Sequence, residues 1–480
     1  MSQTSIAAAG DLKRGLSNRH LQLIAIGGAI GTGLFMGSGK TIFLAGPSVI
    51  LVYAIIGFML FFVMRAMGEM LLANMNYKSL RDAVSDILGP FAGFITGWTY
   101  WFCWVVTGMA DIVAITGYLQ YWWADIPLWL PGIFVIALLL ALNLVAVRLF
   151  GEIEFWFAII KIVAIVGLIC VGLYMVFTRF ETPDGHIAGF NNLINDGGFF
   201  PNGLTGFLAG FQIAIFAFVG IELAGTAAAE TKDPEKTLPR AINSIPVRIV
   251  IFYVLSLIVI MLVTPWDAIN PAVSPFVQLF AFAGIPAAAG VINFVVITSA
   301  ASSANSGIFS TSRMLYGLSL EGAAPRRWAV LSKHRVPARG LVFSVICLIP
   351  ALAMLYAGGT VIEAFTLITT LSSVLFMVVW TYILVAYIVY RRRTPELHAK
   401  SIFPMPGGVP MSCVVLAFFA FMVAVLCLET DTRTALLSAP VWFIILGIGW
   451  VATGGAKGAA SRSQLEVAAP AADSAKSPQA

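Results

Sequence analysis

The chain has 480 residues, of which 59% are hydrophobic and only 11% charged, with a formal net charge of +5. Soluble proteins are about half apolar and about a quarter charged, so this composition excludes an ordinary soluble enzyme and indicates an integral membrane protein. The positive charge is explained by loop residues that set membrane topology, and no nucleic-acid partner is predicted.

Apolar stretches bounded by charged residues, Gly or Pro predict twelve membrane-spanning helices. In chain order they cover residues 21–43, 48–73, 91–121, 128–149, 154–177, 205–228, 241–264, 275–316, 340–357, 361–390, 411–428 and 435–453. The hydrophobicity is continuous rather than alternating, which argues against a β-barrel. The predicted fold class is therefore an all-α protein embedded in a lipid bilayer.

The distribution of basic residues predicts the orientation, because short cytoplasmic loops retain Lys and Arg. With the N-terminus inside, 23 of the 28 Lys and Arg fall in cytoplasmic segments. Both termini are therefore expected on the cytoplasmic side. Residues 1–19 form the predicted N-terminal segment, and the tail 454–480, poor in large apolar residues, is predicted to be disordered.

The first span contains the run GGAIGTG at 27–33, with four glycines in seven residues. Each glycine costs about 1 kcal/mol in a helix interior, so the run predicts a break in mid-membrane. The alternative is close helix packing through small residues. The sixth span carries Gly220 beside Glu222, which indicates a second interruption.

Two interrupted spans, five helices apart, suggest an internal repeat of residues 20–178 and 205–392. Because five is odd, the two units have opposite orientation, as in secondary transporters with a midplane site. A broken helix leaves N–H groups and carbonyls that find no water in lipid. A zwitterion satisfies both, with its carboxylate at Gly31–Gly33 and its ammonium on freed carbonyls. This chemistry indicates the backbone of an α-amino acid.

Lys161 lies one or two turns inside the fifth span. A lysine at that depth costs about 3 kcal/mol unless it is paired or faces a cavity. Either the side chain extends to the cytoplasmic surface, or the ammonium occupies a cation site and exchanges a proton. Glu222 is the second candidate for proton coupling, and it either carries a proton or stabilises the interrupted segment.

Weaker candidates are polar residues of other spans that line a coupling site or merely tie helices together. They are Asp111 in the third span, Glu154 at the start of the fifth, and Ser302, Ser303 and Asn305 in the eighth.

Histidines and cysteines do not indicate an enzyme or a metal site. All four histidines lie in loops or at span ends, which leaves nothing on which to build an intramembrane metal site or a His-based hydrolase. The five cysteines are scattered through apolar runs and are predicted to be buried packing residues. No catalytic residue, metal or cofactor is therefore predicted.

Eight short motifs follow one another along the chain. They are LSNRH at 16–20, IGGAIGTGLF at 26–35, AGP at 45–47, MGEM at 67–70, FVGIE at 218–222, ETKDP at 230–234, PRAI at 239–242 and NSG at 305–307. In these motifs, residues 16–453 resemble the amino acid-polyamine-organocation superfamily and, within it, the proton-coupled bacterial amino acid transporters. The stretches 97–104 and 298–305 are most similar to a subgroup that takes small neutral amino acids.

The resemblance implies a leucine-transporter type fold of five plus five inverted helices, with helices 1 and 6 interrupted and two further helices at 410–453. It implies that the N–H groups of Thr32 and Gly33, beside Gly31, take the substrate carboxylate. Carbonyls of Ala29, Phe216 and Val219, beside Gly220, take the ammonium.

The resemblance also implies coupling roles. Lys161 matches a lysine that replaces a sodium ion in proton-coupled members, and Glu222 matches the family's glutamate of the sixth span. Asp111 replaces a longer glutamate found in many relatives, which puts a direct role for it in doubt.

Together these observations predict a symporter of the bacterial cytoplasmic membrane that imports small neutral amino acids with protons. Glycine, alanine and serine, including D-enantiomers, fit the resemblance. An amino acid exchanger, a symporter for another amino acid class and, less favoured, a membrane sensor of amino acids are the alternatives. No protein partner is predicted to be required.

Overall fold

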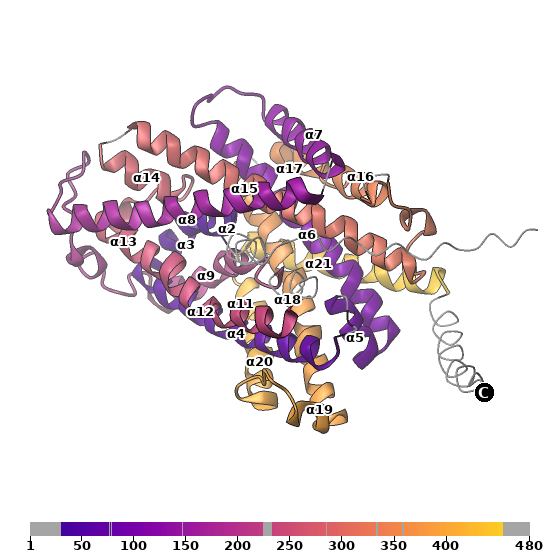
Figure 1. Ribbon diagram of the computed structural model, residues 1–480. Coiled ribbons are helices and arrows are strands. Elements are labelled where there is room, and N and C mark those ends of the chain that lie inside the picture. Colours follow the sequence, from indigo (N-terminus) through magenta and orange to yellow (C-terminus); the bar gives the residue numbers. More distant parts are fainter. Residues whose placement is uncertain are drawn as a thin grey trace, which may run out of the picture.

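The computed structural model describes residues 30–75, 77, 79–145, 147–223, 233–284, 286–332, 335–357 and 360–454. Within these ranges the chain is all-helical, with one isolated bridge between Glu181 and Ile187 (Figure 1). The predicted N-terminal segment 1–19, the tail from 455 and the carbonyl of Ala29 lie outside the described residues.

Most helices fall on the predicted apolar ranges. Those of the first half are α2 (Thr32–Phe35), α3 (Gly37–Ala45), α4 (Val49–Ala73), α5 (Leu80–Leu88), α6 (Pro90–Leu119), α7 (Trp129–Val145) and α8 (Val147–Phe177). Those of the second half are α9 (Gly203–Ala214), α11 (Pro234–Asn243), α12 (Ile245–Arg248), α13 (Ser256–Val263), α14 (Pro275–Phe282), α15 (Pro286–Leu320), α16 (Ala338–Ile346), α17 (Pro350–Ala357), α18 (Val361–Arg393), α19 (Pro395–Ala399), α20 (Gly408–Leu426) and α21 (Thr430–Ala452). Helices α5 and α19 lie between the predicted ranges, and α11 begins before the range 241–264.

Within the described residues, nine helices are long and apolar enough to cross a membrane, and two shorter apolar helices cover Trp129–Leu144 and Gly203–Phe218. One of the nine, Gly37–Ala73, joins α3 to α4. A continuous helix of that length would be about 55 Å long, nearly twice the thickness of the hydrocarbon core. The positive φ of Gly46, +60°, turns the chain there, so α3 and α4 are separate segments.

Two ranges predicted as single spans are divided in the structure. The range 275–316 contains α14 and α15, and Gly284 between them has φ +73°. The range 340–357 contains α16 and α17, because Pro350 cannot continue a hydrogen-bonded helix from the preceding turn. A hydropathy profile does not show either division, since the connecting residues are apolar.

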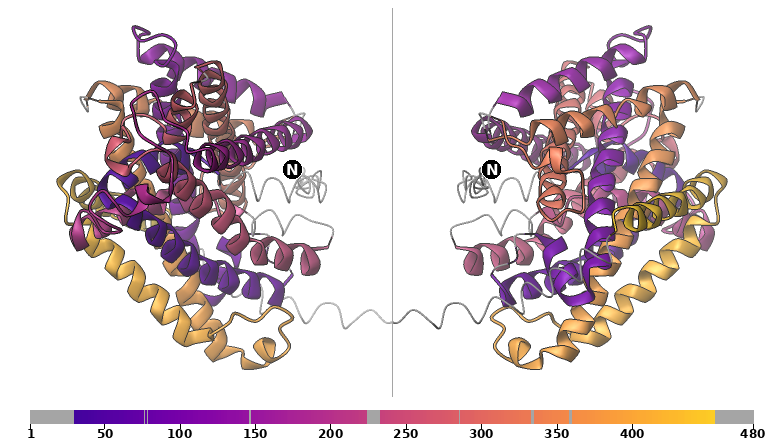
Figure 2. Two further views of the ribbon diagram at one scale, coloured as in Figure 1. Left: turned by 90° about the vertical axis from the view of Figure 1, so that its left-hand side faces the viewer. Right: turned by 90° about the vertical axis from the view of Figure 1, so that its right-hand side faces the viewer.

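Helix α6 forms the centre of the bundle, where it packs against α15 and α18. In its most apolar window 83% of the residues are buried, compared with 17% in α21. Figure 2 shows α20 and α21 along one side of the molecule. These two helices are therefore peripheral, with large apolar side chains such as Leu437 and Val451 exposed for contact with lipid.

The prediction that the cysteines are buried packing residues is wrong for most of them. Cys103 in α6 is buried and Cys347 is intermediate, whereas Cys170, Cys413 and Cys427 are exposed. An apolar run fixes the depth of a residue in the membrane, but it does not distinguish the side of a helix that faces lipid from the side that faces protein.

Glu69 in α4 fixes the α18–α20 linker, residues 394–407, to the ends of α4 and α18. The Glu69 side chain is fully buried. Its Oε1 lies 2.5 Å from Nδ1 of His398, and its Oε2 accepts hydrogen bonds from the Tyr387 hydroxyl at 2.9 Å and the Met405 N–H at 2.7 Å. This carboxylate is thus the common acceptor for three groups.

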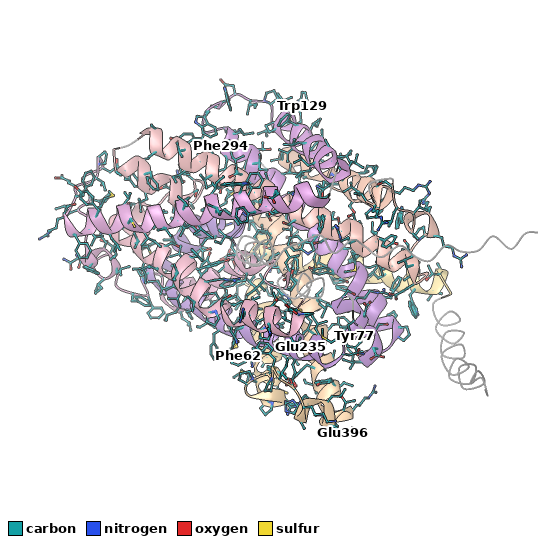
Figure 3. The ribbon with its side chains drawn as sticks, viewed as in Figure 1. Phe62, Tyr77, Trp129, Glu235, Phe294 and Glu396 are labelled. Carbon is teal, nitrogen blue, oxygen red and sulfur yellow. The ribbon has the colours of Figure 1, made fainter. Side chains whose placement is uncertain are left out.

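Arg65, one turn before Glu69 in α4, contacts the same linker. Its guanidinium lies over the ring of Phe403, 3.7 Å from the centroid, and donates to Asn243 of α11 at 2.9 Å. Figure 3 shows Tyr77, Glu235 and Glu396 toward the lower side of the molecule, away from Trp129 and Phe294. These three residues, each from a segment predicted to be cytoplasmic, therefore lie on the same side in this view.

We predict that Glu69→Ala destabilises the protein by about 3 kcal/mol, because it leaves buried donors without their acceptor. Thermal unfolding of the purified protein in detergent measures this as a lower melting temperature. Glu396→Ala, an exposed carboxylate of the same linker, is the control and is expected to leave the melting temperature unchanged. Equal melting temperatures for wild type and Glu69→Ala would contradict the assigned role of the carboxylate.

Candidate functional site

The sixth predicted span is interrupted near Gly220. After α9, the 3₁₀ helix η3 (Ile215–Phe218) ends at Val219, which is extended with ψ 136°. Gly220 then has φ +94°, a conformation that glycine adopts without steric cost. Turns continue to Glu222, and residues 224–232 lie outside the described residues. The interruption therefore occurs where a glycine and a carboxylate are two residues apart in sequence.

In the first predicted span, the described helix begins only at Thr32. Gly31 before it is extended, with φ −125° and ψ −167°, and its carbonyl accepts from the N–H groups of Leu34 and Phe35. The N–H groups of Thr32 and Gly33 therefore lie at the open end of the helix, where no intrahelical acceptor precedes them. The carbonyl of Ile30 is taken by a side chain, the hydroxyl of Ser299, at 3.1 Å.

The start of this first described helix contacts the segment just before the Gly220 interruption through backbone atoms. A Cβ added to Gly33 would lie 2.6 Å from Cα of Ala217 and 2.9 Å from the carbonyl carbon of Phe216. Real Cβ atoms do not approach backbone so closely, so only glycine fits at this position. The helix start at Thr32 and the end of η3 thus form one site, assembled from segments far apart in the sequence.

Tyr253 supports the interrupted segment from a neighbouring helix. It lies in η4, a π-helical stretch at Ile249–Leu255 between α12 and α13. Its buried hydroxyl donates to the carbonyl of Ala217 at 2.8 Å. The Phe216 carbonyl accepts the N–H of Val219 at 3.1 Å, and this bond uses one of its two lone pairs.

Asp111 in α6 directly contacts the first helix. Its Oδ1 accepts from the Thr32 hydroxyl at 2.8 Å, and both side chains are buried. Ser303 of α15 lies beside the same carboxyl group, and Lys161 is near enough to interact with it electrostatically. The sequence comparison with longer glutamates put a direct role for Asp111 in doubt, but the structure shows that the shorter side chain reaches the helix start.

Lys161 belongs to a buried network at the interface of α8 with α15. Its Nζ donates to the Ser302 hydroxyl at 3.1 Å, and that hydroxyl donates to Oε2 of Glu154 at 2.7 Å. Asn305 donates to Oε1 of Glu154 at 3.1 Å and accepts from Asn143 of α7 at 2.7 Å. With 1% of its surface exposed, Lys161 does not extend to the surface, which was one of its two interpretations.

Glu222 occupies a different environment from the lysine network. Its Oε1 accepts from the Tyr100 hydroxyl at 3.4 Å, and the carboxyl group is fully buried. Among the described residues, its Oε2 has no hydrogen-bond partner. The rings of Trp104 and Phe376 pack edge-on against Tyr100. The indole of Trp380 and the backbone of Gly220 also lie close enough to interact with this carboxyl group.

The structure therefore brings most predicted site residues into two neighbouring groups. The first group lies where the start of α2 meets η3 and contains Thr32, Gly33, Phe216, Ser303 and Asp111. The second group is the neighbouring hydrogen-bond network of Lys161, Glu154, Ser302 and Asn305. Three contacts around the site were not predicted, those of Asn143, Tyr100 and Tyr253. Only Asn143 had a signal in the sequence, an isolated amide in an apolar span.

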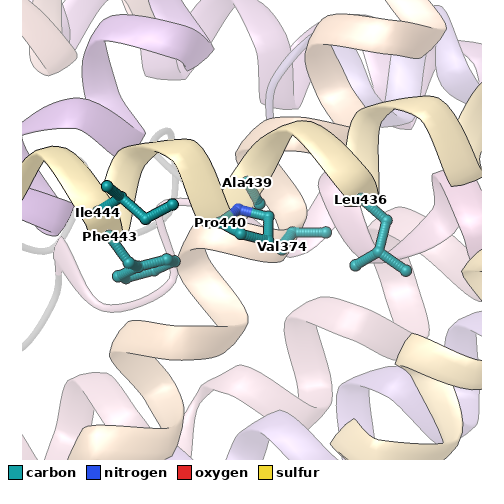
Figure 4. Close-up of a pocket in the computed structure, with 6 residues that line it drawn as sticks. All are labelled: Val374, Leu436, Ala439, Pro440, Phe443 and Ile444. Carbon is teal, nitrogen blue, oxygen red and sulfur yellow. The ribbon is translucent and has the colours of Figure 1, made fainter.

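A groove on the outer face of the bundle is separate from this site. It has a volume of about 490 Å³ and is lined only by apolar residues of α18 and α21 (Figure 4). They are Val374, Leu436, Ala439, Pro440, Phe443 and Ile444. A groove without polar side chains offers nothing to a charged amino acid.

Comparison with known proteins places the chain among transporters. The amino acid permease family model matches residues 20–455. The D-serine/D-alanine/glycine transporter of Escherichia coli (strain K12) is 67% identical over 443 residues, which cover 92% of this chain and 94% of that protein. Amino-acid permease AapA of Bacillus subtilis (strain 168) is 50% identical over 435 residues, covering 91% and 94%. The probable threonine/serine transporter YbxG of the same strain is 42% identical over 444 residues, covering 92% and 96%.

We predict that Gly33→Ala lowers substrate exchange at least about tenfold, because overpacking against backbone costs about 1–3 kcal/mol. Exchange of radiolabelled glycine across proteoliposomes measures this. Gly167→Ala in α8 is the matched control, since its added Cβ meets no atom within 4 Å. Equal exchange by Gly33→Ala and wild type would show that the two interruptions do not need close contact.

Proposed function

The chain belongs to the amino acid permease family and is an amino acid transporter of the membrane, and from this premise we propose that it imports small neutral amino acids together with protons. The observation that carries the proposal is the contact of two helix interruptions at Gly33 and Ala217. The contact supports a site in which open N–H groups at the start of one segment and carbonyls of the other face a single ligand. These are complementary to the two charged groups of one amino acid.

In the proposed binding mode, the N–H groups of Thr32 and Gly33 take the substrate carboxylate, aided by the positive end of the helix dipole. The ammonium is held by the carbonyls of Phe216 and Val219, with Ala29 as the expected third. The Thr32 hydroxyl donates to Asp111, so it does not bind the substrate. The Thr32 N–H is left to bind the substrate carboxylate.

The proposed substrates are glycine, D-alanine, D-serine and L-alanine. The relative that is 67% identical is named as a D-serine/D-alanine/glycine transporter, which supports this choice. Binding through the groups that every α-amino acid shares also accepts both enantiomers when the side chain is small. The neighbouring Ser303 hydroxyl, 3.8 Å from a Cβ added to Gly31, offers a polar contact to such a side chain.

Proton coupling is assigned to Lys161 and Glu222. Lys161 is buried within electrostatic reach of Asp111, which itself bonds the substrate segment, so a change of charge on the lysine is felt at the binding site. Glu222 offers a second buried position for a proton. Because the proton carries charge inward, import follows the membrane potential, worth about 2.3 kcal/mol per 100 mV.

The proposed architecture has twelve spans in the bacterial cytoplasmic membrane, with both termini in the cytoplasm. Residues 20–178 and 205–392 form inverted repeats of five helices, and 410–453 add two more. The site between the interrupted helices then opens alternately to the two sides as one group of helices rocks against the other.

We predict that glycine accumulation in proteoliposomes requires a proton gradient or a negative internal potential, and that Lys161→Ala abolishes accumulation. Uptake of labelled glycine with and without a protonophore measures both. Lys400→Ala, in the α18–α20 linker, is the control with normal accumulation expected. Uptake that depends only on preloaded internal amino acid would establish an exchanger instead.

We also predict that excess D-serine, D-alanine and L-alanine compete with labelled glycine, whereas proline and phenylalanine do not. The reason is that the contacts are those of a free ammonium and a carboxylate beside a small side chain. Competition assays in the same vesicles measure this. Inhibition by proline and phenylalanine alone would assign the chain to another amino acid class.

A further inference from the structure

We propose that Glu154 is the counter-ion that keeps the proton on Lys161, acting through the hydroxyl of Ser302. The inference rests on the proposed proton coupling through Lys161 and names the group that sets its proton affinity. Glu154 is a positioning residue in this scheme, since it acts on the lysine and does not touch the amino acid.

The donor and acceptor roles in this network can be assigned in order, starting from Asn143. The amide nitrogen of Asn143 donates to the carbonyl of Leu139 at 2.9 Å and to Oδ1 of Asn305 at 2.7 Å. The Asn305 side chain is therefore oriented with its oxygen toward Asn143 and its amino group toward Glu154, to which it donates at 3.1 Å. Asn305 presents a donor to Glu154, which needs no proton of its own to make this bond.

The second oxygen of Glu154 accepts as well. A serine hydroxyl has one hydrogen, and Ser302 gives it to Glu154 at 2.7 Å. Its contact with Lys161 at 3.1 Å must then be donated by Nζ. With Glu154 as a carboxylate, both of its oxygens accept and Lys161 donates, so the contacts fit a carboxylate and an ammonium separated by one hydroxyl.

The geometry explains why the hydroxyl is needed. Lys161 and Glu154 are seven residues apart in α8, so they share a face but lie about 10 Å apart along the axis. Helical side chains lean toward the N-terminus, which brings the lysine toward Glu154. Ser302, from α15 alongside α8 (Figure 1), completes the path. The link between the charges therefore exists only while α8 and α15 remain packed.

Two acidic groups act on the lysine from different helices. Glu154 lies on its own helix α8, and Asp111 lies on α6. Asp111 is engaged by the Thr32 hydroxyl and connects the lysine to the substrate segment. Glu154, whose neighbours are Ser302 and Asn305, has no such bond to the substrate segment among the described residues and is therefore assigned to holding the charge.

The test compares the pH dependence of gradient-driven glycine uptake by full-length wild type and Glu154→Gln in proteoliposomes. Without the carboxylate the ammonium is less stable, so loading requires a higher proton concentration. The half-maximal pH is expected to move toward acid by about one unit or more. Glu152→Gln, which removes the same charge two residues away on α8, is expected to keep the wild-type profile, and Glu154→Asp to restore part of the shift.

Each outcome decides between the inference and the proposed function. Gradient-dependent uptake by wild type, with an unshifted profile and normal glycine exchange in Glu154→Gln, overturns the inference and leaves the coupling proposal standing. Gradient-independent uptake by wild type overturns both.

If Glu154→Gln shows no exchange because it fails to fold, Ser302→Ala decides. An acid shift there, absent in Ser312→Ala on the same helix α15, supports the inference. An unshifted profile in Ser302→Ala overturns it.

Discussion

Hydrocarbon provides no hydrogen-bond partners, so a membrane helix can be interrupted only where protein covers the exposed backbone. Among the described residues, the start of the first helix covers the segment that precedes the interruption at Gly220. Gly33 lies against the backbone of Ala217 with no room for a side chain, and Gly220 supplies the positive φ that ends the helical path. The remaining architecture, with α6 and α15 packed around these segments, encloses backbone that would otherwise face lipid.

Enclosure also determines what the site can bind. Side chains from surrounding helices satisfy part of the freed backbone, as Ser299 does at Ile30 and Tyr253 does at Ala217. The open N–H groups at Thr32 and Gly33 remain at the helix start. A ligand with an anionic and a cationic group at short separation completes the hydrogen bonding, whereas a larger apolar molecule does not. On the proposed binding mode, the same constraint that makes the interruption costly also explains selectivity for amino acids.

The sequence predicted those features that depend on neighbouring residues along the chain. Continuous hydrophobicity located the helices, and glycine beside a carboxylate located the interruption at Gly220. It failed where the direction of a side chain around its helix decides the outcome, as for the exposed Cys170 and the buried Cys103. The bond between Lys161 and Ser302 joins residues 141 positions apart. No local pattern predicts such a partner, although the high cost of a buried lysine predicted that a partner or a cavity must exist.

The charges behind the site connect proton occupancy to helix packing. With its proton, Lys161 and Glu154 together carry no net charge, and without it the pair carries one negative charge. Burial of a neutral pair costs less than burial of a net charge. On the proposed assignment, loading of the proton therefore favours the arrangement in which α8 and α15 stay packed and Ser302 bridges the pair. Loss of the proton favours access of water to Glu154. On the proposed binding mode, a substrate carboxylate at Thr32 adds a negative charge near Asp111 and favours the ammonium form of Lys161. On this assignment substrate and proton stabilise each other's binding, which is the thermodynamic requirement for symport.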